Sequence, residues 1–334
     1  MASQENQLQA SATIRASVLI PIIDQLEKTG MRTEPLLDRH GIIRSQISDP
    51  YAMVPISRYI EFFEDAASTS GSPLMGALMG TGITPGDLGP TGVLFSISPN
   101  ILEAIHRLTR YLSAIQGATS TGLQEFDGDY VWSYQISSPA LWPRRQDSEF
   151  TLSVSCQLIR LCFSRNWRPL EVQFEHPEPP DSAGLAKIFR APLKFGQPSN
   201  RLVISRTDAQ KIYRSEDPAL VAVLEHHIAE LAALSSAPQS LPERVRALIG
   251  ANLGYRKIRI ADVARDLGLA PRTLQRRLML EGTSLREIVE DYRRELAEKQ
   301  IRARLNKRKI ADTLGYADST VFWRARKRWT RDEG

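Results

Sequence analysis

Cysteine and histidine are both scarce in this sequence, which limits the chemistry it can support. The 334 residues include only two cysteines, Cys156 and Cys162, and five histidines. The cysteines are six positions apart on an expected helix, so they face different directions and form no CxxC pair. We therefore expect buried, reduced thiols. The adjacent His226 and His227 cannot point at one metal and the other histidines are scattered, so neither a metal site nor a cofactor is expected.

Long hydrophobic runs are absent as well. The longest apolar stretch near the N-terminus, Ala16 to Ile23, is too short to cross a bilayer, and nothing before it has the form of a signal peptide. We expect residues 1–10 to be a disordered tail, the protein to be cytoplasmic, and no membrane to be a partner. The glycine-rich stretch GITPGDLGPTG lacks the strand-glycine-helix order and the lysine of a phosphate-binding loop. Because no catalytic set is found elsewhere, the sequence does not indicate an enzyme.

Positive charge is concentrated at the C-terminal end. Residues 241–334 hold 23 lysines and arginines against 13 aspartates and glutamates, whereas the preceding residues hold 20 against 25. Residues 241–334, the basic module, therefore carry a net charge of about +10, and residues 1–240 carry about −5. This distribution indicates attraction to phosphate that is confined to one domain.

The basic module contains two copies of one pattern, the first from Ile260 to Leu278. Apolar residues at positions i, i+3, i+4 and i+7 give its first helix one apolar face, formed by Ile260, Val263, Ala264 and Leu267. Gly268 suits the left-handed end of this helix, and Pro271 suits the first position of the next. Leu274 and Leu278 are expected to point inward. The residues expected to contact DNA are Arg272, Thr273, Gln275, Arg276 and Arg277. Arginine and glutamine form bidentate pairs with guanine and adenine edges in the major groove.

The second copy runs from Lys309 to Trp329. Its first helix has Ile310, Ala311 and Leu314 inward and turns at Gly315 and Tyr316, and its second helix has Phe322, Ala325 and Trp329 inward. Ser319, Thr320, Trp323 and Arg324 are then left to face a groove, with Lys327, Arg328 and Arg331 near phosphates. A single helical hairpin with a glycine turn can imitate a helix-turn-helix, but two at this spacing are much harder to obtain by chance.

A helix between the two copies provides the right separation. Residues from Ser284 to about Arg304 carry apolar side chains at helical spacing. A helix of roughly 20 residues is about 30 Å long, close to the roughly 34 Å between successive major-groove faces on one side of B-DNA. The sequence therefore predicts an all-α DNA-binding domain whose two recognition helices enter successive major grooves.

These residues resemble a known family. The stretches LGLAPRTLQRRL, EGTSLREIVEDYRRELA and KIADTLGY, followed by the Arg328-Trp329 pair, are similar to the DNA-binding domain of the AraC/XylS family of bacterial transcription regulators. Counting the preceding helix, the resemblance covers about 90 residues. It implies base contacts from Arg272, Gln275 and Arg276, and from the corresponding positions of the second helix, Ser319, Thr320, Trp323 and Arg324.

The sequence departs from the family pattern at two informative positions. Ala270 stands where the family usually has a serine N-cap, and alanine is a poor cap that costs about 1 kcal/mol. Arg326 stands where the second recognition helix usually carries an aromatic core residue. Because a buried unpaired arginine is costly, we expect Arg326 to extend outward or to pair with a phosphate.

The residues before the module are expected to form an α+β sensor domain over residues 11–234, joined to the DNA-binding domain of residues 241–334 by a linker at 235–240. Ser240 and Glu243 form an expected capping box where that domain begins. Helices are expected at Ser11 to Lys28, Arg32 to His40, Ile56 to Thr69, Pro73 to Met79, Asn100 to Ala114, Ser148 to Phe163, Asp181 to Phe189 and Asp217 to Leu234. Strands are expected at Gly92 to Ile97, Thr119 to Phe126, Asp129 to Ile136, Leu170 to Glu175 and Leu202 to Ile204, with Asp127 and Gly128 forming a hairpin turn.

This region also resembles part of the same family. VPISRYIEFFEDAA, SPLMGALMG, GDLGPTGVLFSISPNILEAIHRLTRYL, FGQPSNRLVI and EDPAL are similar to the arabinose-binding type of N-terminal domain found in ornithine- and arginine-responsive members. The resemblance implies a small-molecule effector, and nothing in this sequence singles out a sugar. On the strand Asp129 to Ile136, the residues Tyr130, Trp132 and Tyr134 share one face and are candidate ligand contacts, although such a row is more often core. Weaker candidates are Phe95, Trp142 and Glu149, the last of which has a simple alternative role at a helix N-terminus.

The sequence thus predicts a DNA-binding transcription regulator that is modulated by a small molecule. Its expected partners are double-stranded promoter or operator DNA and an effector, with RNA polymerase and a second copy of the chain as further candidates. A helix around Leu220 to Leu234 is a possible dimer contact, although an amphipathic helix is more often core. The competing class is a ligand-independent architectural DNA-binding protein, whose affinity depends little on sequence.

Overall fold

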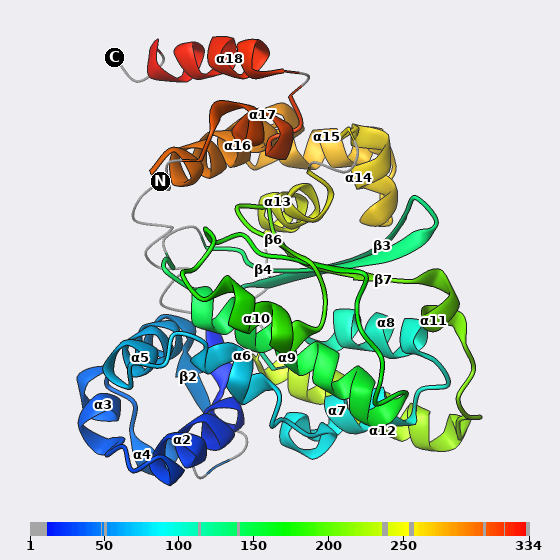
Figure 1. Cartoon of the computed structure of the whole chain (residues 1–334). Helices are drawn as coiled ribbons and strands as arrows, with labels where there is room; N and C mark the ends of the chain where they lie inside the picture. Colours follow the sequence, from blue (N-terminus) through cyan, green and yellow to red (C-terminus); the bar gives the residue numbers. More distant parts are fainter. Residues whose placement is uncertain are drawn as a thin grey trace. The chain divides into compact units, whose positions relative to one another are not determined.

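The computed structural model describes residues 12–47, 49, 52–112, 115–138, 141–235, 240–253, 257–302, 305–316 and 318–331. The chain forms two compact units (Figure 1). One comprises Met1–Val172, Pro180–Leu193 and Arg201–Pro238, and the other comprises Gln173–Pro179, Lys194–Asn200 and Gln239–Gly334. The expected N-terminal tail and most of the expected linker lie outside the described residues.

The first unit begins with a two-stranded sheet. Strand β1 (Thr13–Arg15) pairs antiparallel with β2 (Met53–Pro55), with Ile14 opposite Val54. The expectation of a continuous helix from Ser11 to Lys28 is therefore wrong over its first residues, because pairing with a strand distant in sequence overrides local propensity. The helices of this part are η1 (Ala16–Val18), α2 (Leu19–Lys28), α3 (Glu34–Arg39), α4 (Arg44–Ile47) and α5 (Ile56–Thr69).

The segment from Gly92 to Ile97, expected as a strand, is helical. It belongs to α7 (Gly89–Ile97), which buries Leu94 and Phe95. A short apolar run fits a strand or a buried helix equally well, so its periodicity could not decide between them. The neighbouring helices are α6 (Met75–Gly80), η2 (Pro85–Leu88) and α8 (Ile101–Tyr111).

A five-stranded sheet forms the β part of the fold, with strand order β3-β4-β7-β5-β6. Its strands are β3 (Thr119–Phe126), β4 (Asp129–Ile136), β5 (Glu171–Gln173), β6 (Leu193–Lys194) and β7 (Asn200–Ile204). The expected hairpin between β3 and β4 is confirmed and is visible as the long pair of arrows in Figure 1. Asp127 and Gly128 both have positive φ, 52° and 85°, as a tight two-residue hairpin turn requires.

Helices α6 and α9 (Arg145–Cys162) pack closely because two glycines face the contact. A Cβ atom on Gly76 would lie 2.1 Å from the carbonyl oxygen of Gln146, and one on Gly80 would lie 2.6 Å from the Cβ of Ser153. Any side chain there would force the helices apart. The remaining helices of the first unit are α10 (Ser182–Phe189), α11 (Arg206–Gln210) and α12 (Pro218–Ser235), and α12 buries Ile228 with Leu94 and Tyr111.

The second unit is mostly helical and has one core. Its helices are α13 (Leu241–Asn252), α14 (Ile260–Asp266), α15 (Pro271–Leu280), α16 (Leu285–Arg302), α17 (Lys307–Thr313) and α18 (Ser319–Arg331). Buried apolar side chains form a single cluster that extends from Val245 of α13 to Trp329 of α18. The capping box of Ser240 and Glu243 is confirmed at the start of α13.

Two non-helical segments, residues 173–179 and 194–200, complete this second unit. The Tyr292 hydroxyl donates to the carbonyl oxygen of Pro198 at 2.9 Å, and Gln300 Nε2 donates to that of Gly196 at 2.7 Å. Both hydrogen bonds are buried. Helix α16 is therefore held on one side by backbone that precedes it by about 100 residues.

Candidate nucleic-acid interface

Helices α14 and α15 form the first helix-turn-helix. Gly268 ends α14 with a φ of +67°, and the N–H of Leu269 donates to the carbonyl oxygen of Ala264 at 2.8 Å, which closes the turn. Pro271 occupies the first position of α15. Leu274 and Leu278 are buried, as predicted from their spacing. The local sequence therefore fixes which face of α15 is left outward.

The outward face of α15 carries side chains that have no partner in the described part of the chain. Arg272, Gln275, Arg276 and Arg277 are exposed, and none of their side chains makes a hydrogen bond or an ion pair with any described residue. Thr273 is half-buried beside them. The face thus presents three guanidinium groups and one amide to solvent, which are the donors that pair with guanine, adenine and phosphate.

Helices α17 and α18 form the second helix-turn-helix. Gly315 has a φ of +70°, and the N–H of Tyr316 donates to the carbonyl oxygen of Ala311 at 2.9 Å. Asp318 Oδ1 accepts from the backbone N–H groups of Thr320 at 2.7 Å and Val321 at 2.9 Å. These hydrogen bonds lower the pKa of Asp318, and they identify it as the N-cap of α18. Sequence reasoning missed this cap, although the acidic residue just before the helical run was the signal for it.

The predicted inward residues of α18 are confirmed, since Phe322, Ala325 and Trp329 are buried. Thr320, Arg324, Lys327 and Arg328 are exposed, whereas Ser319 is half-buried. Trp323, which was expected to face the groove, is only partly exposed. Its ring is half-buried, with Lys307 Nζ 5.1 Å and the Arg326 guanidinium 4.5 Å from the ring centroid.

The Arg326 guanidinium lies over the ring of Trp323, which offsets the cost of partly burying its charge. The side chain is half-buried, and a guanidinium over a tryptophan face is electrostatically favourable. The aromatic residue usual at this position of the family is thus replaced by a cation that packs on the neighbouring Trp323. Arg326 was expected either to extend into solvent or to contact a phosphate. In the structure it is half-buried and lies against the ring of Trp323.

Helix α16 connects the two motifs through specific contacts. Arg293 Nε donates to the carbonyl oxygen of Leu314 at 3.1 Å, and its guanidinium lies 4.8 Å from the centroid of the Tyr316 ring. Trp329 Nε1 donates to Glu290 Oε2 at 3.0 Å. At the other side of the helix Arg246 of α13 pairs with Glu295. These contacts hold the second motif and α13 on α16, and both recognition helices contribute buried side chains to one core.

Three of the ligand-contact candidates lie in the core of the first unit. Phe95, Trp132 and Tyr134 are at most 1% exposed. Trp132 Nε1 donates to Thr109 Oγ1 at 3.1 Å, and the Tyr134 hydroxyl donates to Asp147 Oδ2 at 2.5 Å. Burial and Asp147 together raise the pKa of Tyr134 well above its usual value. These polar groups are satisfied within the protein.

The other three candidates lie in different surroundings. Tyr130 is half-buried, and its hydroxyl accepts from Gln210 Nε2 at 2.8 Å. Trp142 is 38% exposed. Glu149 is fully buried in α9 and accepts from Arg145 Nε at 2.6 Å, while burial raises its pKa to about 7. The structure therefore does not bring all six candidates to one surface.

The described residues contain no group of three or more histidine, cysteine, aspartate and glutamate side chains placed to hold a metal ion. None of the described helices combines the length and the apolar character needed to cross a membrane. Cys156 is buried and Cys162 half-buried, both as free thiols, and burial raises the pKa of Cys156 to about 12.

Comparison with known proteins identifies the family of the chain. The family model for the N-terminal arabinose-binding domain of AraC transcription regulators matches residues 30–211, which is more than half of the chain. The chain belongs to the AraC family of transcription regulators. An ornithine utilization regulator of Pseudomonas aeruginosa is 24% identical over 92% of this chain and 91% of its own. The AraC-family assignment predicted from the two helix-turn-helix motifs is thereby confirmed.

Two further proteins are similar to this chain. The HTH-type transcriptional regulator VirS of Mycobacterium tuberculosis is 22% identical over 96% of this chain and 95% of its own. The crystal structure of the transcriptional regulator CdpR from Pseudomonas aeruginosa matches 89% of this chain and 93% of its own, at 20% identity and a TM-score of 0.44. As a member of the AraC family, the chain is a DNA-binding transcription regulator with an N-terminal domain that senses a small molecule.

Proposed function

We propose that α15 and α18 enter two successive major grooves on one side of duplex DNA. The observation that carries this proposal is the single core of the second unit, to which α15, α16 and α18 all contribute buried side chains. Helix α16 has 18 residues, which correspond to about 27 Å at the usual rise, and the turns at its ends add to that length. One turn of B-DNA is about 34 Å, so the linker is suited to this spacing.

The side chains divide into two expected roles. Arg272, Gln275 and Arg276 on α15 would contact base edges, because they are exposed, unpartnered and near the start of the helix. On α18 the same role would belong to Ser319, Thr320 and Arg324, with Trp323 contributing from its half-buried position. Thr273, Arg277, Lys327 and Arg328 would contact phosphates, which position the protein without specifying sequence.

The first unit is proposed to bias this DNA reader through its effector. To switch the protein, an effector must bind the DNA-competent state more tightly than the other state, and couplings of this kind are typically about 1 to 3 kcal/mol. Tyr130 and Trp142 are the candidate ligand contacts with accessible rings, whereas Phe95, Trp132, Tyr134 and Glu149 would require rearrangement of the core.

Two macromolecular partners belong to the same proposal. Helix α12 buries Ile228 but leaves Leu220 43% and Val223 65% exposed, so this outward apolar strip is the candidate contact with a second copy. A regulator that promotes transcription also acts on RNA polymerase at its promoter. Because chromosomal DNA and RNA polymerase lie in the bacterial cytoplasm, the proposal includes a cytoplasmic location.

The test is a selection of genomic DNA fragments with the purified full chain at moderate salt. An enriched motif with two half-elements about 10 bp apart is the expected result, since it corresponds to one helical turn. Enrichment of fragments without a shared motif, in the presence of candidate effectors as well as in their absence, would instead favour the architectural class of DNA-binding protein.

A further inference from the structure

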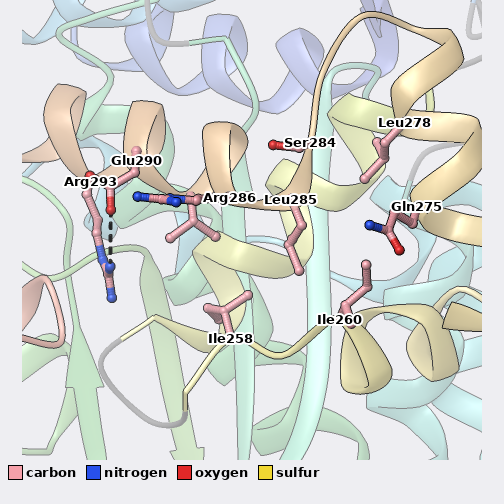
Figure 2. A pocket seen from close by; sticks show the side chains of 10 residues that line it. Ile258, Ile260, Gln275, Leu278, Ser284, Leu285, Arg286, Glu290 and Arg293 are labelled. Carbon is pink, nitrogen blue, oxygen red and sulfur yellow. Dashed lines mark ion pairs between the residues drawn. The ribbon is translucent and has the colours of Figure 1, made fainter. Parts of the chain in front are cut away.

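The DNA-binding unit contains a cavity beside its first recognition helix. It has a volume of about 400 Å³ and lies between the residues that precede and open α14, the middle of α15 and the first half of α16 (Figure 2). Cavities that hold small molecules have volumes of about 300 to 1,000 Å³, so this one is large enough for a compact ligand. Its lining residues, Ile258 to Arg293, follow the stretch of residues 30–211 that the arabinose-binding family model matches.

The floor of the cavity is apolar. Ile258, Ile260, Leu285 and Val289 are half-buried side chains packed against the core cluster, and the buried Leu278 joins them. Apolar surface that stays in contact with water is unfavourable. A ligand with an apolar body would gain by covering this floor, whereas a bare phosphate would not.

The charged side chains that line the cavity are Arg286, Glu290 and Arg293, and they differ in whether they have partners. Arg293 is held by the Leu314 carbonyl and lies near Glu290 at 3.9 Å, and Glu290 itself accepts from Trp329. Arg286, in contrast, is exposed and has no hydrogen-bond or ion-pair partner among the described residues. It also lies in the first turn of α16, where the helix dipole disfavours a cation. Arg286 is therefore available to an external anion.

We propose that this cavity binds a small amphiphilic carboxylate, with its apolar body on the isoleucine and leucine floor and its carboxylate on Arg286. Gln275, a proposed base-contacting residue, lines the same cavity and faces it in Figure 2. An occupant would hold the Gln275 side chain away from DNA and weaken operator binding. This consequence rests on the proposed function of α15, whereas the binding itself does not.

Photolabelling of the full chain tests the binding without DNA. The probe is an octanoate that carries a diazirine on its chain, and the matched control probe is the corresponding alcohol; labelled peptides are mapped by mass spectrometry. We expect labelling at residues 258–260 and 285–289. Loss of a charge-assisted hydrogen bond typically weakens binding about tenfold, so the alcohol and the variant Arg286→Gln should each require about tenfold more probe.

The matched control variant is Arg302→Gln, which removes the same charge from the same helix at a side chain that is 83% exposed. It should label like the wild type. The proposal would be overturned if residues 258–260 and 285–289 were not labelled. It would also be overturned if the alcohol probe labelled as well as the carboxylate probe and Arg286→Gln labelled as well as the wild type. Inorganic phosphate serves as a competitor: if it displaces the probe at equal concentration, the site is a plain phosphate contact and the amphiphile is excluded.

A second measurement tests the consequence for DNA. Octanoate should lower the affinity of the wild type for its selected motif and leave the affinity of Arg286→Gln unchanged by the same addition. Equal inhibition of both proteins would contradict the role of the cavity. Because the labelling needs no DNA, a chain that labels as expected but selects no motif would refute the proposed function and leave the binding site established.

Discussion

Arginine side chains of the second unit fall into a paired and an unpaired group. Arg246 pairs with Glu295, and Arg294 with Asp291, so these guanidinium groups already have an acidic partner within the protein. Arg272, Arg276 and Arg277 have no such partner among the described residues, and all three lie on the outward face of α15. An exposed ion pair contributes little to stability, so its absence costs the fold little and leaves these donors free for DNA.

Replacing two of these basic residues should separate base recognition from phosphate contact. Arg276→Ala is expected to weaken binding to the selected motif by about 1 to 3 kcal/mol and to relax specificity at one base position. Lys327→Ala should weaken binding to all DNA sequences alike and reduce the slope of log affinity against log salt concentration by about 1. Fluorescence anisotropy on matched and mutated duplexes at several salt concentrations measures both effects. Arg265→Ala, whose guanidinium pairs with Asp262 on α14, is the control. Equal, sequence-blind losses for Arg276→Ala and Lys327→Ala would contradict the division of roles.

Glu149 should make the first unit sensitive to pH. Burial raises its pKa to about 7 from an ordinary 4.5, so the folded state holds this proton more tightly than the unfolded state does. Its contribution to stability is therefore greatest below about pH 4.5 and is lost as the pH rises toward 7. As the pH rises from 4.5 to 8, the free energy of unfolding of Glu149→Gln should increase by about 3 kcal/mol relative to that of the wild type, as measured by urea unfolding. The same substitution at the exposed Glu281 supplies the reference, and a gain that does not change with pH would refute the assignment.

Among the elements, the two recognition helices begin differently. Helix α18 is capped by Asp318, whereas Ala270 stands at the N-cap of α15 without any side-chain cap hydrogen bond. The second motif, which departs more from the family pattern at Arg326, is thus the one with the better formed helix start. The first motif depends on Pro271 and on the buried Leu274 and Leu278 to hold its helix.

A serine at position 270 should supply the missing cap. The backbone of Ala270 is extended, with φ −73° and ψ 145°, which is the conformation of an N-cap residue. Ala270→Ser is therefore expected to stabilise the second unit by about 1 kcal/mol, measured by thermal or urea unfolding. Ala261→Ser, at the exposed second position of α14, makes the same chemical change at a residue that is not the N-cap and should give no comparable gain. Equal effects of the two substitutions would argue against capping as the cause.

Elements defined by local signals could be predicted from the sequence. The turns at Gly268 and Gly315, the Asp127-Gly128 hairpin and the inward residues of both recognition helices are all confirmed, because each depends on residues within one or two turns of chain. Strand β1 was missed because its partner β2 lies about 40 residues away. The segment Gly92–Ile97 was assigned wrongly because a short apolar run does not distinguish a strand from a buried helix.

The candidate site followed the same rule. The exposed face of α15 was predictable from helical periodicity alone. The surroundings of Trp323 and the cavity beside Gln275 were not, since the first depends on side chains from α17 and α18 and the second on side chains from α14, α15 and α16. The cap at Asp318 had a local signal in the sequence and was overlooked. The aromatic row on β4 illustrates the limit: its alternation was correct, but alternation does not say whether a face meets a ligand or the core.

For the whole molecule, the central claim is that one rigid core sets the distance between two DNA-reading helices. The buried cluster is continuous from Val245 to Trp329, and α16 contacts the turn of the second motif through Arg293. A flexible connection would tolerate half-elements at many spacings, whereas a rigid one requires a single spacing and a single face of the duplex. The net positive charge of residues 241–334 adds affinity for any duplex but cannot produce this dependence on spacing.

The most direct measurement is the affinity of the full chain for its selected motif after 5 or 10 bp are inserted between the half-elements. An insertion of 5 bp rotates the second half-element by about half a turn to the opposite face, and 10 bp moves it about 34 Å further along the same face. The rigid core predicts that both insertions reduce the affinity to that of a duplex with one half-element. Retention of full affinity after either insertion would contradict the account.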